Sequence, residues 1–259
     1  MHKYEVIVFS ILFFISATLI FAVQPMIGKM MLPHVGGSPA GWIVALAFFQ
    51  TALLAGYAFA HFCSKLNVFT QSLVTLAILG AGFSFFPLGF QGQWINEGQD
   101  VTSFLVFVKL TLIISVPFIA LSSITPAIQR VFSAGTHATS KDPYYFYAAS
   151  NLGSLFGLFS YPFLIEPFFP LDLQTDIWTS TYSILFGLSI LCCGYIFITN
   201  KRLISLGLGD SHLSDDHADI AKADKPDGAT LFKWFALAAI PANLILGVTN
   251  YIITDIASI

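Results

Sequence analysis

Seven stretches of about twenty predominantly apolar residues alternate with polar breaks, and this alternation constrains the fold more than any other feature of the chain. The stretches cover residues 6–24, 41–62, 69–90, 103–124, 144–164, 177–199 and 231–254. A helix needs about 20 apolar residues to cross the roughly 30 Å hydrocarbon core of a membrane. Membrane-spanning strands are shorter and alternate apolar with polar side chains, which these stretches do not do. The sequence therefore predicts an all-α fold, a polytopic helical membrane bundle in a lipid bilayer.

The composition excludes two broad classes of protein. Charged residues make up 10% of the chain, whereas a soluble domain averages about 25%. A soluble enzyme of 259 residues would need more charge to cover its surface. The eleven Lys and Arg residues in a chain of net charge −3 form no basic face, so no nucleic acid is expected as a partner. The three cysteines lack metal-ligand spacing, and no metal, cofactor or catalytic motif is predicted.

The distribution of cations predicts the orientation of the chain. If the N-terminus is placed inside the cell, the inner segments contain nine of the eleven cations. These cations are Lys3, Lys65, Arg130, Lys141, Lys201, Arg202, Lys222, Lys225 and Lys233. Lys29 is then the one cation in an outer loop, and Lys109 lies within the fourth stretch. Because cytoplasmic loops of membrane proteins carry an excess of Lys and Arg, the N-terminus is predicted to be cytoplasmic.

The polar breaks also predict how the chain is divided. Residues 1–199 contain the first six stretches and are expected to form a six-helix membrane domain. Residues 200–230 are rich in Asp, Lys, Gly and Ser and contain too few large apolar side chains to fold alone, which predicts a cytoplasmic polar linker. Residues 231–259 are expected to form a seventh transmembrane helix.

A weak internal repeat relates the first three stretches to the next three. Pro25 and Pro126 lie at the ends of the first and fourth stretches, 101 residues apart, and each is followed by an Ile two residues later and a cation four residues later. Tyr57 and Tyr161 lie at equivalent places in the second and fifth stretches, 104 residues apart. Three helices per repeat place the second copy in the membrane with the opposite orientation. This is the inverted 3+3 arrangement within each six-helix half of major-facilitator transporters.

Three segments resemble a known family of bacterial membrane proteins. They read VQPMIGKMMLP at 23–33, DPYYFYAASNLGS at 142–154 and GVTNYIITDIA at 247–257. Further matching positions are Tyr161, Glu166, Gln174 and Trp178. Together these residues resemble the N-terminal membrane region of fused major-facilitator/spermidine-synthase-like proteins. In that resemblance, six helices form one major-facilitator half, and the seventh begins a second half that lies outside this chain.

The resemblance implies a transporter-like membrane domain for a small polar or cationic solute, in the bacterial inner (plasma) membrane. An alternative is a membrane anchor for a polyamine aminopropyltransferase, whose catalytic domain is absent from the chain. Members of the family carry such a domain with a Gly-rich turn, and nothing in this sequence matches it. Any enzymatic activity would lie in the missing sequence. A purely structural helical bundle is the third alternative.

Five polar side chains are candidate substrate-binding residues. Lys109 lies inside an apolar stretch, where a charge is costly unless it is paired, hydrated or able to reach the headgroups. Gln50 and Asn151 are expected to be buried amides that bind either a solute or a neighbouring helix. Glu166, expected on the outer side, is a candidate partner for Lys109 or for Lys29. Asp255 is expected to end the seventh helix on the same side.

Small residues predict where helices approach closely. Gly153 and Gly157 form a Gly-x-x-x-Gly pair in the fifth stretch, and Ala52 and Gly56 form a similar stripe in the second. Such stripes are typical of helix–helix packing in membranes. Trp178 lies at the end of its stretch and is expected to belong to an aromatic belt at the membrane interface.

Overall fold

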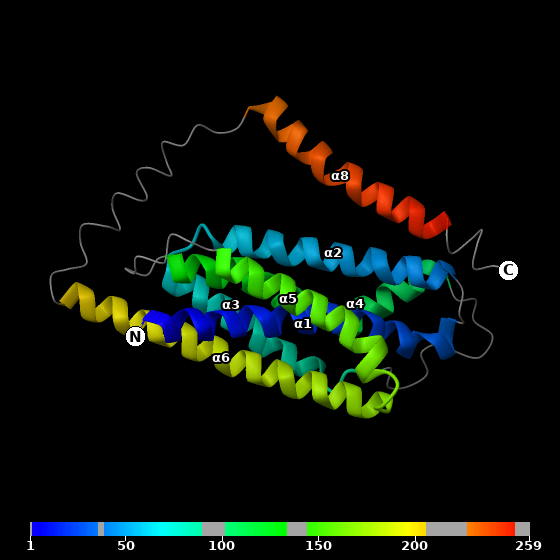
Figure 1. The fold of residues 1–259 in the computed structure, drawn as a ribbon, viewed down its shortest axis with the longest axis horizontal. Helices are drawn as coiled ribbons and strands as arrows, with labels where there is room; N and C mark the ends of the chain where they lie inside the picture. Colours follow the sequence, from blue (N-terminus) through cyan, green and yellow to red (C-terminus); the bar gives the residue numbers. More distant parts are fainter. Residues whose placement is uncertain (1, 36–38, 90–101, 134–143, 206–226, 252–259) are drawn as a thin grey trace. The chain divides into compact units, whose positions relative to one another are not determined.

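The described part of the chain is helical. The computed structural model describes residues 2–35, 39–89, 102–133, 144–205 and 227–251, and no strand occurs among them. The helices are α1 (His2–Val35), α2 (Pro39–Cys63), α3 (Val68–Gly82), the 3-10 turn η1 (Phe83–Phe85), α4 (Ser103–Ser133), α5 (Tyr144–Ser160), the π-helical segment η3 (Tyr161–Ile165), α6 (Leu171–Ser205) and α8 (Gly228–Tyr251) (Figure 1). The prediction of an all-α fold is confirmed for these residues.

Seven of these helices are long and apolar enough to cross a membrane, which is consistent with an integral membrane domain. The chain forms two units, residues 1–209 and 210–259. In the first unit, α6 continues to Ser205, so the beginning of the expected linker at 200–230 is helical. In the second unit, α8 begins at Gly228 and Asp227 caps it, because the Thr230 backbone N–H donates to the Asp227 carboxylate at 2.8 Å.

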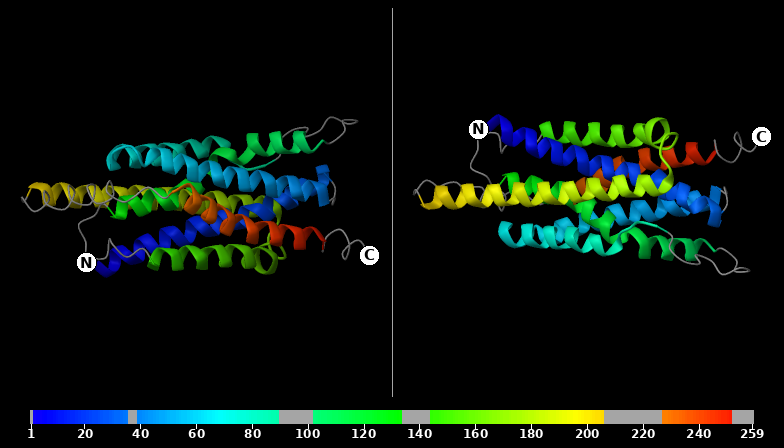
Figure 2. Two further views of the ribbon diagram at one scale, coloured as in Figure 1. Left: turned by 90° about the horizontal axis from the view of Figure 1, so that it is seen from above. Right: turned by 90° about the horizontal axis from the view of Figure 1, so that it is seen from below.

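Within the first unit, successive helices run in opposite directions. Phe14 of α1 lies beside Gly153 of α5, and Lys29, further along α1, lies beside Glu166, which follows η3. Residue numbers therefore increase in the same direction along both helices, so α1 and α5 are parallel. α6 runs antiparallel to α3, since Phe69 at the start of α3 contacts Phe197 and Phe83 after its end contacts Tyr182. The chain colours show that α6 also runs antiparallel to α1, which it contacts where the Trp178 indole donates to the Leu19 carbonyl (Figure 1). α3 and α5 lie at opposite edges of this bundle (Figure 2). The alternating directions are those expected for six consecutive membrane crossings.

Helices α1 and α4 form the centre of the bundle. They cross where the Ser16 hydroxyl donates to the Leu121 carbonyl at 3.3 Å, and both groups are buried. Each helix continues through internal prolines, Pro25 and Pro33 in α1, and Pro117 and Pro126 in α4. Neighbouring helices in a membrane bundle make such prolines tolerable because they shield or satisfy the freed backbone groups. α1 packs mainly on α5 and α6, whereas α4 packs mainly on α2 and α3.

Candidate functional site

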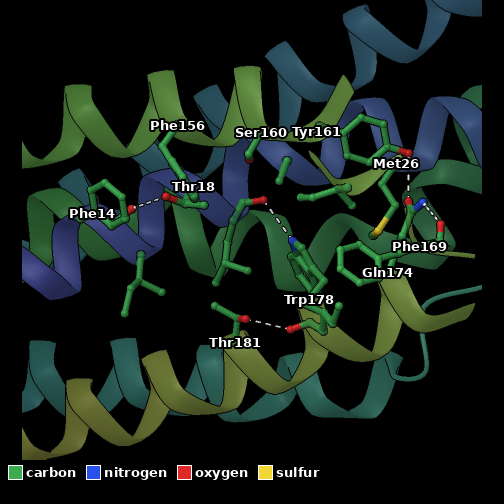
Figure 3. Close-up of a pocket in the computed structure, with 15 residues that line it drawn as sticks. Phe14, Thr18, Met26, Phe156, Ser160, Tyr161, Phe169, Gln174, Trp178 and Thr181 are labelled. Carbon is green, nitrogen blue, oxygen red and sulfur yellow. Dashed lines mark hydrogen bonds between the residues drawn. The ribbon is translucent and has the colours of Figure 1, made fainter. Parts of the chain in front are cut away.

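A pocket of about 290 Å³ lies between α1, α5, η3 and α6. Fifteen residues line it, among them Phe14, Thr18 and Met26 of α1 (Figure 3). Phe14 and Met26 are twelve residues apart on one helix, which gives the pocket a length of about 18 Å along α1. Its volume is just below the range of about 300–1,000 Å³ that is usual for ligand pockets. We call this feature the intramembrane pocket.

The polar groups on the pocket wall already have partners within the protein. The Tyr161 hydroxyl donates to the Gln174 side-chain oxygen at 3.0 Å, and the Gln174 amide nitrogen donates to the Phe169 carbonyl at 2.9 Å (Figure 3). The Trp178 indole donates to the Leu19 carbonyl at 3.0 Å. The Thr18 hydroxyl lies within hydrogen-bond distance of the Phe14 carbonyl at 2.8 Å and of the Gly153 carbonyl at 3.1 Å. Since these donors are satisfied, the wall presents a mainly apolar surface to a ligand.

An ion pair lies beyond one end of the intramembrane pocket. Lys29 Nζ is 3.2 Å from Glu166 Oε1, and the two side chains are 35% and 44% exposed. Glu166 directly follows the lining residue Ile165, and Lys29 is one helical turn beyond the lining residue Met26. Glu166 also lies between the spanning segments that end at Ile165 and begin at Leu171. Glu166 is therefore at the end of a spanning segment, where the membrane headgroups are expected, and it pairs with Lys29, which lies in the last part of the spanning segment that ends at Val35.

The π-helical segment η3 shapes this end of the pocket. Earlier in α5, Gly153 and Gly157 lie directly against the α1 backbone, so that a Cβ at Gly157 would be 2.7 Å from the Thr18 carbonyl oxygen. After Ser160 the helix widens into the π segment, which ends where the Glu166 N–H donates to the Tyr161 carbonyl at 2.8 Å. Single π turns inside α-helices are frequent at functional sites.

Gln50 and Asn151 differ from their expected burial. Both side chains are exposed on the surface of the first unit, so the expectation of two buried amides was wrong. The reason is that α2 and α5 are apolar on every side, and periodicity in such helices does not distinguish the buried face from the exposed one. Gln50 lies on α2 and Asn151 on α5, each facing away from the central helices α1 and α4.

The structure places the two candidate charges Glu166 and Lys109 apart from each other. Glu166 pairs with Lys29 and not with Lys109, so the expected Lys109–Glu166 contact is not formed. Lys109 is half-buried on α4, and no carboxylate of the described residues lies within ion-pair distance of it. Asp255 lies outside the described residues. The described residues also contain no cluster of three metal-ligating side chains.

The small residues of α2 occupy a close contact with α4. A Cβ at Gly56 would be 2.8 Å from the Ile119 carbonyl oxygen and would overlap the Ser122 side chain. Ala52, one turn earlier, is 5% exposed. Close backbone approach of this kind is the usual role of small residues between membrane helices.

Sequence reasoning did not identify the residues of the intramembrane pocket as a site. Trp178 is 4% exposed and hydrogen-bonded to α1, so its expected place in an interfacial aromatic belt was wrong. Tyr161, Gln174 and Trp178 belong to the segments on which the expected family resemblance was based, and so do Met26 and Lys29. The fold brings these separate segments together at one end of the pocket (Figure 3). Membership in these matching segments was the signal that the sequence offered, and the spacing of the residues did not show that they meet in the fold.

No family model matches the chain, and no curated protein or solved structure is detectably similar to it.

Proposed function

We propose that residues 1–205 form one half of a two-half membrane transporter, built from two inverted three-helix repeats. The observation that carries the proposal is a set of helix contacts that recurs after a shift of 101 residues. Gly157 of α5 packs on Thr18 of α1, and Gly56 of α2 packs on Ile119 of α4. Both members of the first contact lie 101 residues from their counterparts in the second. The exchange of α1 with α4 and of α5 with α2 is the relation expected between two inverted repeats.

The same shift relates two exposed stripes on α2 and α5. On α2 the stripe is Ile43, Ala47, Gln50, Leu54 and Tyr57, all exposed. On α5 it is Tyr144, Ala148, Asn151, Leu155 and Leu158, all exposed. Each residue of the first stripe has its equivalent 101 positions later in the second, so that Gln50 corresponds to Asn151 and Tyr57 corresponds to Leu158 instead of the Tyr161 expected from the sequence. Each stripe therefore carries an amide at the same place on an otherwise mostly apolar face.

An amide in contact with lipid chains loses its hydrogen bonds to water, at a cost of a few kcal/mol. The two equivalent exposed amides therefore favour an arrangement in which their face of the unit lines a hydrated pathway and another helical unit covers this face. Amides donate and accept hydrogen bonds, which suits a small polar solute. Cationic solutes belong to the same proposal, and Asp255 remains a predicted binding carboxylate. Glu166 contributes less, because Lys29 already neutralises it.

The proposed relationship to fused major-facilitator/spermidine-synthase-like proteins rests on the segments at 23–33, 142–154 and 247–257. It implies a second membrane half as partner and a bacterial inner membrane as location. The excess of cations in alternate loops supports a cytoplasmic N-terminus within this proposal.

Cysteine accessibility tests the hydrated pathway. Gln50→Cys and Asn151→Cys are made separately in full-length protein whose Cys63, Cys192 and Cys193 are replaced by Ser, and intact cells are treated with a membrane-impermeant thiol reagent. We expect both cysteines to react, because a solute pathway contains water. Leu152→Cys is the matched control, since Leu152 is 61% exposed on α5 but lies next to the stripe and faces lipid in this proposal. If the Gln50→Cys and Asn151→Cys variants are as inert as Leu152→Cys, the pathway is not where we place it.

A further inference from the structure

We propose that the intramembrane pocket binds one acyl chain of a phosphatidylethanolamine molecule, whose phosphate contacts Lys29 and whose ammonium contacts Glu166. The proposal does not depend on transport. It rests on the length of the pocket, the chemistry of its wall and the charges at its end.

The dimensions of the pocket fit a lipid chain from one leaflet. The pocket extends about 18 Å along α1, and one leaflet of hydrocarbon is about 15 Å deep, half of a 30 Å core. It begins beside Met26 and Ile165, where the spanning segment formed by α5 and η3 ends, and it ends beside Phe14 within the bundle. An extended acyl chain that enters from the headgroup side would therefore run parallel to α1 along the whole length of the pocket.

The wall of the pocket favours hydrocarbon over a polar ligand. Tyr161, Gln174 and Trp178 use their donors within the protein. A polar ligand would lose hydrogen bonds to water without replacing them, at a cost of about 1–3 kcal/mol for each group. The remaining lining is largely aliphatic and aromatic, with Phe14, Met26 and Phe156 among its members (Figure 3). Methylene groups need no polar partner.

The ion pair selects the headgroup. Lys29 and Glu166 are each partly exposed, so each retains accessible surface for a further partner. A headgroup that carries both a phosphate and a primary ammonium complements a cation and an anion 3.2 Å apart. Phosphatidylglycerol has no ammonium for Glu166. Phosphatidylcholine has a quaternary ammonium without N–H donors, so it cannot donate a hydrogen bond to the carboxylate.

Fluorescence quenching by brominated lipids tests the proposal. The full chain with Trp42, Trp94 and Trp234 replaced by Phe retains Trp178 on the pocket wall as the single fluorophore. It is reconstituted into phosphatidylcholine vesicles that contain increasing amounts of a lipid with brominated acyl chains. The headgroup of that lipid is ethanolamine, glycerol or choline. We expect the ethanolamine lipid to quench Trp178 with an apparent association constant roughly fivefold above the other two.

A matched control reports lipid that merely surrounds the protein. A variant that retains Trp234 alone carries its fluorophore on α8, where Trp234 is 57% exposed. Its quenching is expected to be the same for all three headgroups. Lys29→Gln and Glu166→Gln, each made in the Trp178-only chain, are expected to reduce the ethanolamine preference of Trp178 to less than twofold.

Two occluding variants test the location. Ala22→Phe and Thr181→Phe introduce a ring from opposite walls, α1 and α6, and each is expected to abolish the ethanolamine preference. Using two positions keeps the test valid if one variant fails to fold. The proposal is overturned if the three headgroups quench Trp178 equally in the unsubstituted pocket, or if the preference persists in a folded occluding variant. The first result would also fit a pocket filled by a protein segment.

Discussion

Replacing Gly153 by Ala should separate α1 from α5 and destabilise the first unit. A Cβ at this position would overlap the Phe14 carbonyl oxygen and lie 2.9 Å from the Phe14 Cα and carbonyl carbon. These are backbone atoms in the middle of a helix, so no rotamer change relieves the contact. Carbon atoms prefer a separation of about 3.5 Å or more, so the two helices must move apart by roughly 0.5–1 Å.

The expected cost combines two effects. Overpacking of a tight contact costs about 1–3 kcal/mol. Separation of the helices also lengthens the 3.1 Å hydrogen bond from the Thr18 hydroxyl to the Gly153 carbonyl, and such a bond between membrane helices contributes about 0.6 kcal/mol. We therefore expect Gly153→Ala to lower the free energy of unfolding by about 1.5–3.5 kcal/mol relative to a Gly→Ala change at an open helix position.

Unfolding in mixed micelles of increasing SDS content, followed by Trp178 fluorescence, measures this change. Trp178 is a suitable reporter because it is buried against α1 at Leu19, near the perturbed contact. Gly187→Ala is the matched control, since a Cβ at Gly187 in α6 meets nothing within 4 Å. Both variants share the gain in helix propensity from Gly to Ala, so that their difference isolates the packing. Equal stability of the two variants, within about 0.5 kcal/mol, would refute the close contact between α1 and α5.

Three further predictions follow from other parts of the chain. A reporter active only in the cytoplasm should give signal when fused after Asp216 and none when fused after Gln93, and the reverse pattern would contradict the orientation. Arg130→Met should lower the free energy of unfolding in mixed micelles by about 1.5–3 kcal/mol, because Arg130 donates to the Leu66 carbonyl at 3.0 Å and to the buried Gln71 side chain. Arg130→Lys should lose less stability than Arg130→Met, because an ammonium group can still donate to one of these acceptors. Hydrogen bonds from the Thr230 hydroxyl and backbone N–H hold the pKa of Asp227 below its ordinary value near 3.8. The cap therefore stabilises α8 above that pH and is lost as the pH falls through the lowered pKa, and an NMR titration showing an ordinary pKa would contradict it.

Apolarity and length by themselves determined the helical class and the spanning segments. Runs such as 103–124 can satisfy their backbone groups in lipid only as helices, and this requirement holds for any packing of the chain. The helix ends were less accurate, because α1 continues through Pro25 and Pro33 to Val35, well beyond the expected end at residue 24. A proline that ends a helix in water is tolerated where neighbouring helices cover it.

Which face of each helix is buried was decided only by the tertiary structure. Gln50 and Asn151 face outward and Trp178 faces inward, although the sequence pattern of their helices does not distinguish a buried face from an exposed one. In such helices the hydrophobic pattern has no direction, so the burial of a residue depends on where the neighbouring backbone approaches. The pairing of Lys29 with Glu166 and the intramembrane pocket beside it depend in the same way on contacts between α1 and segments more than 130 residues away.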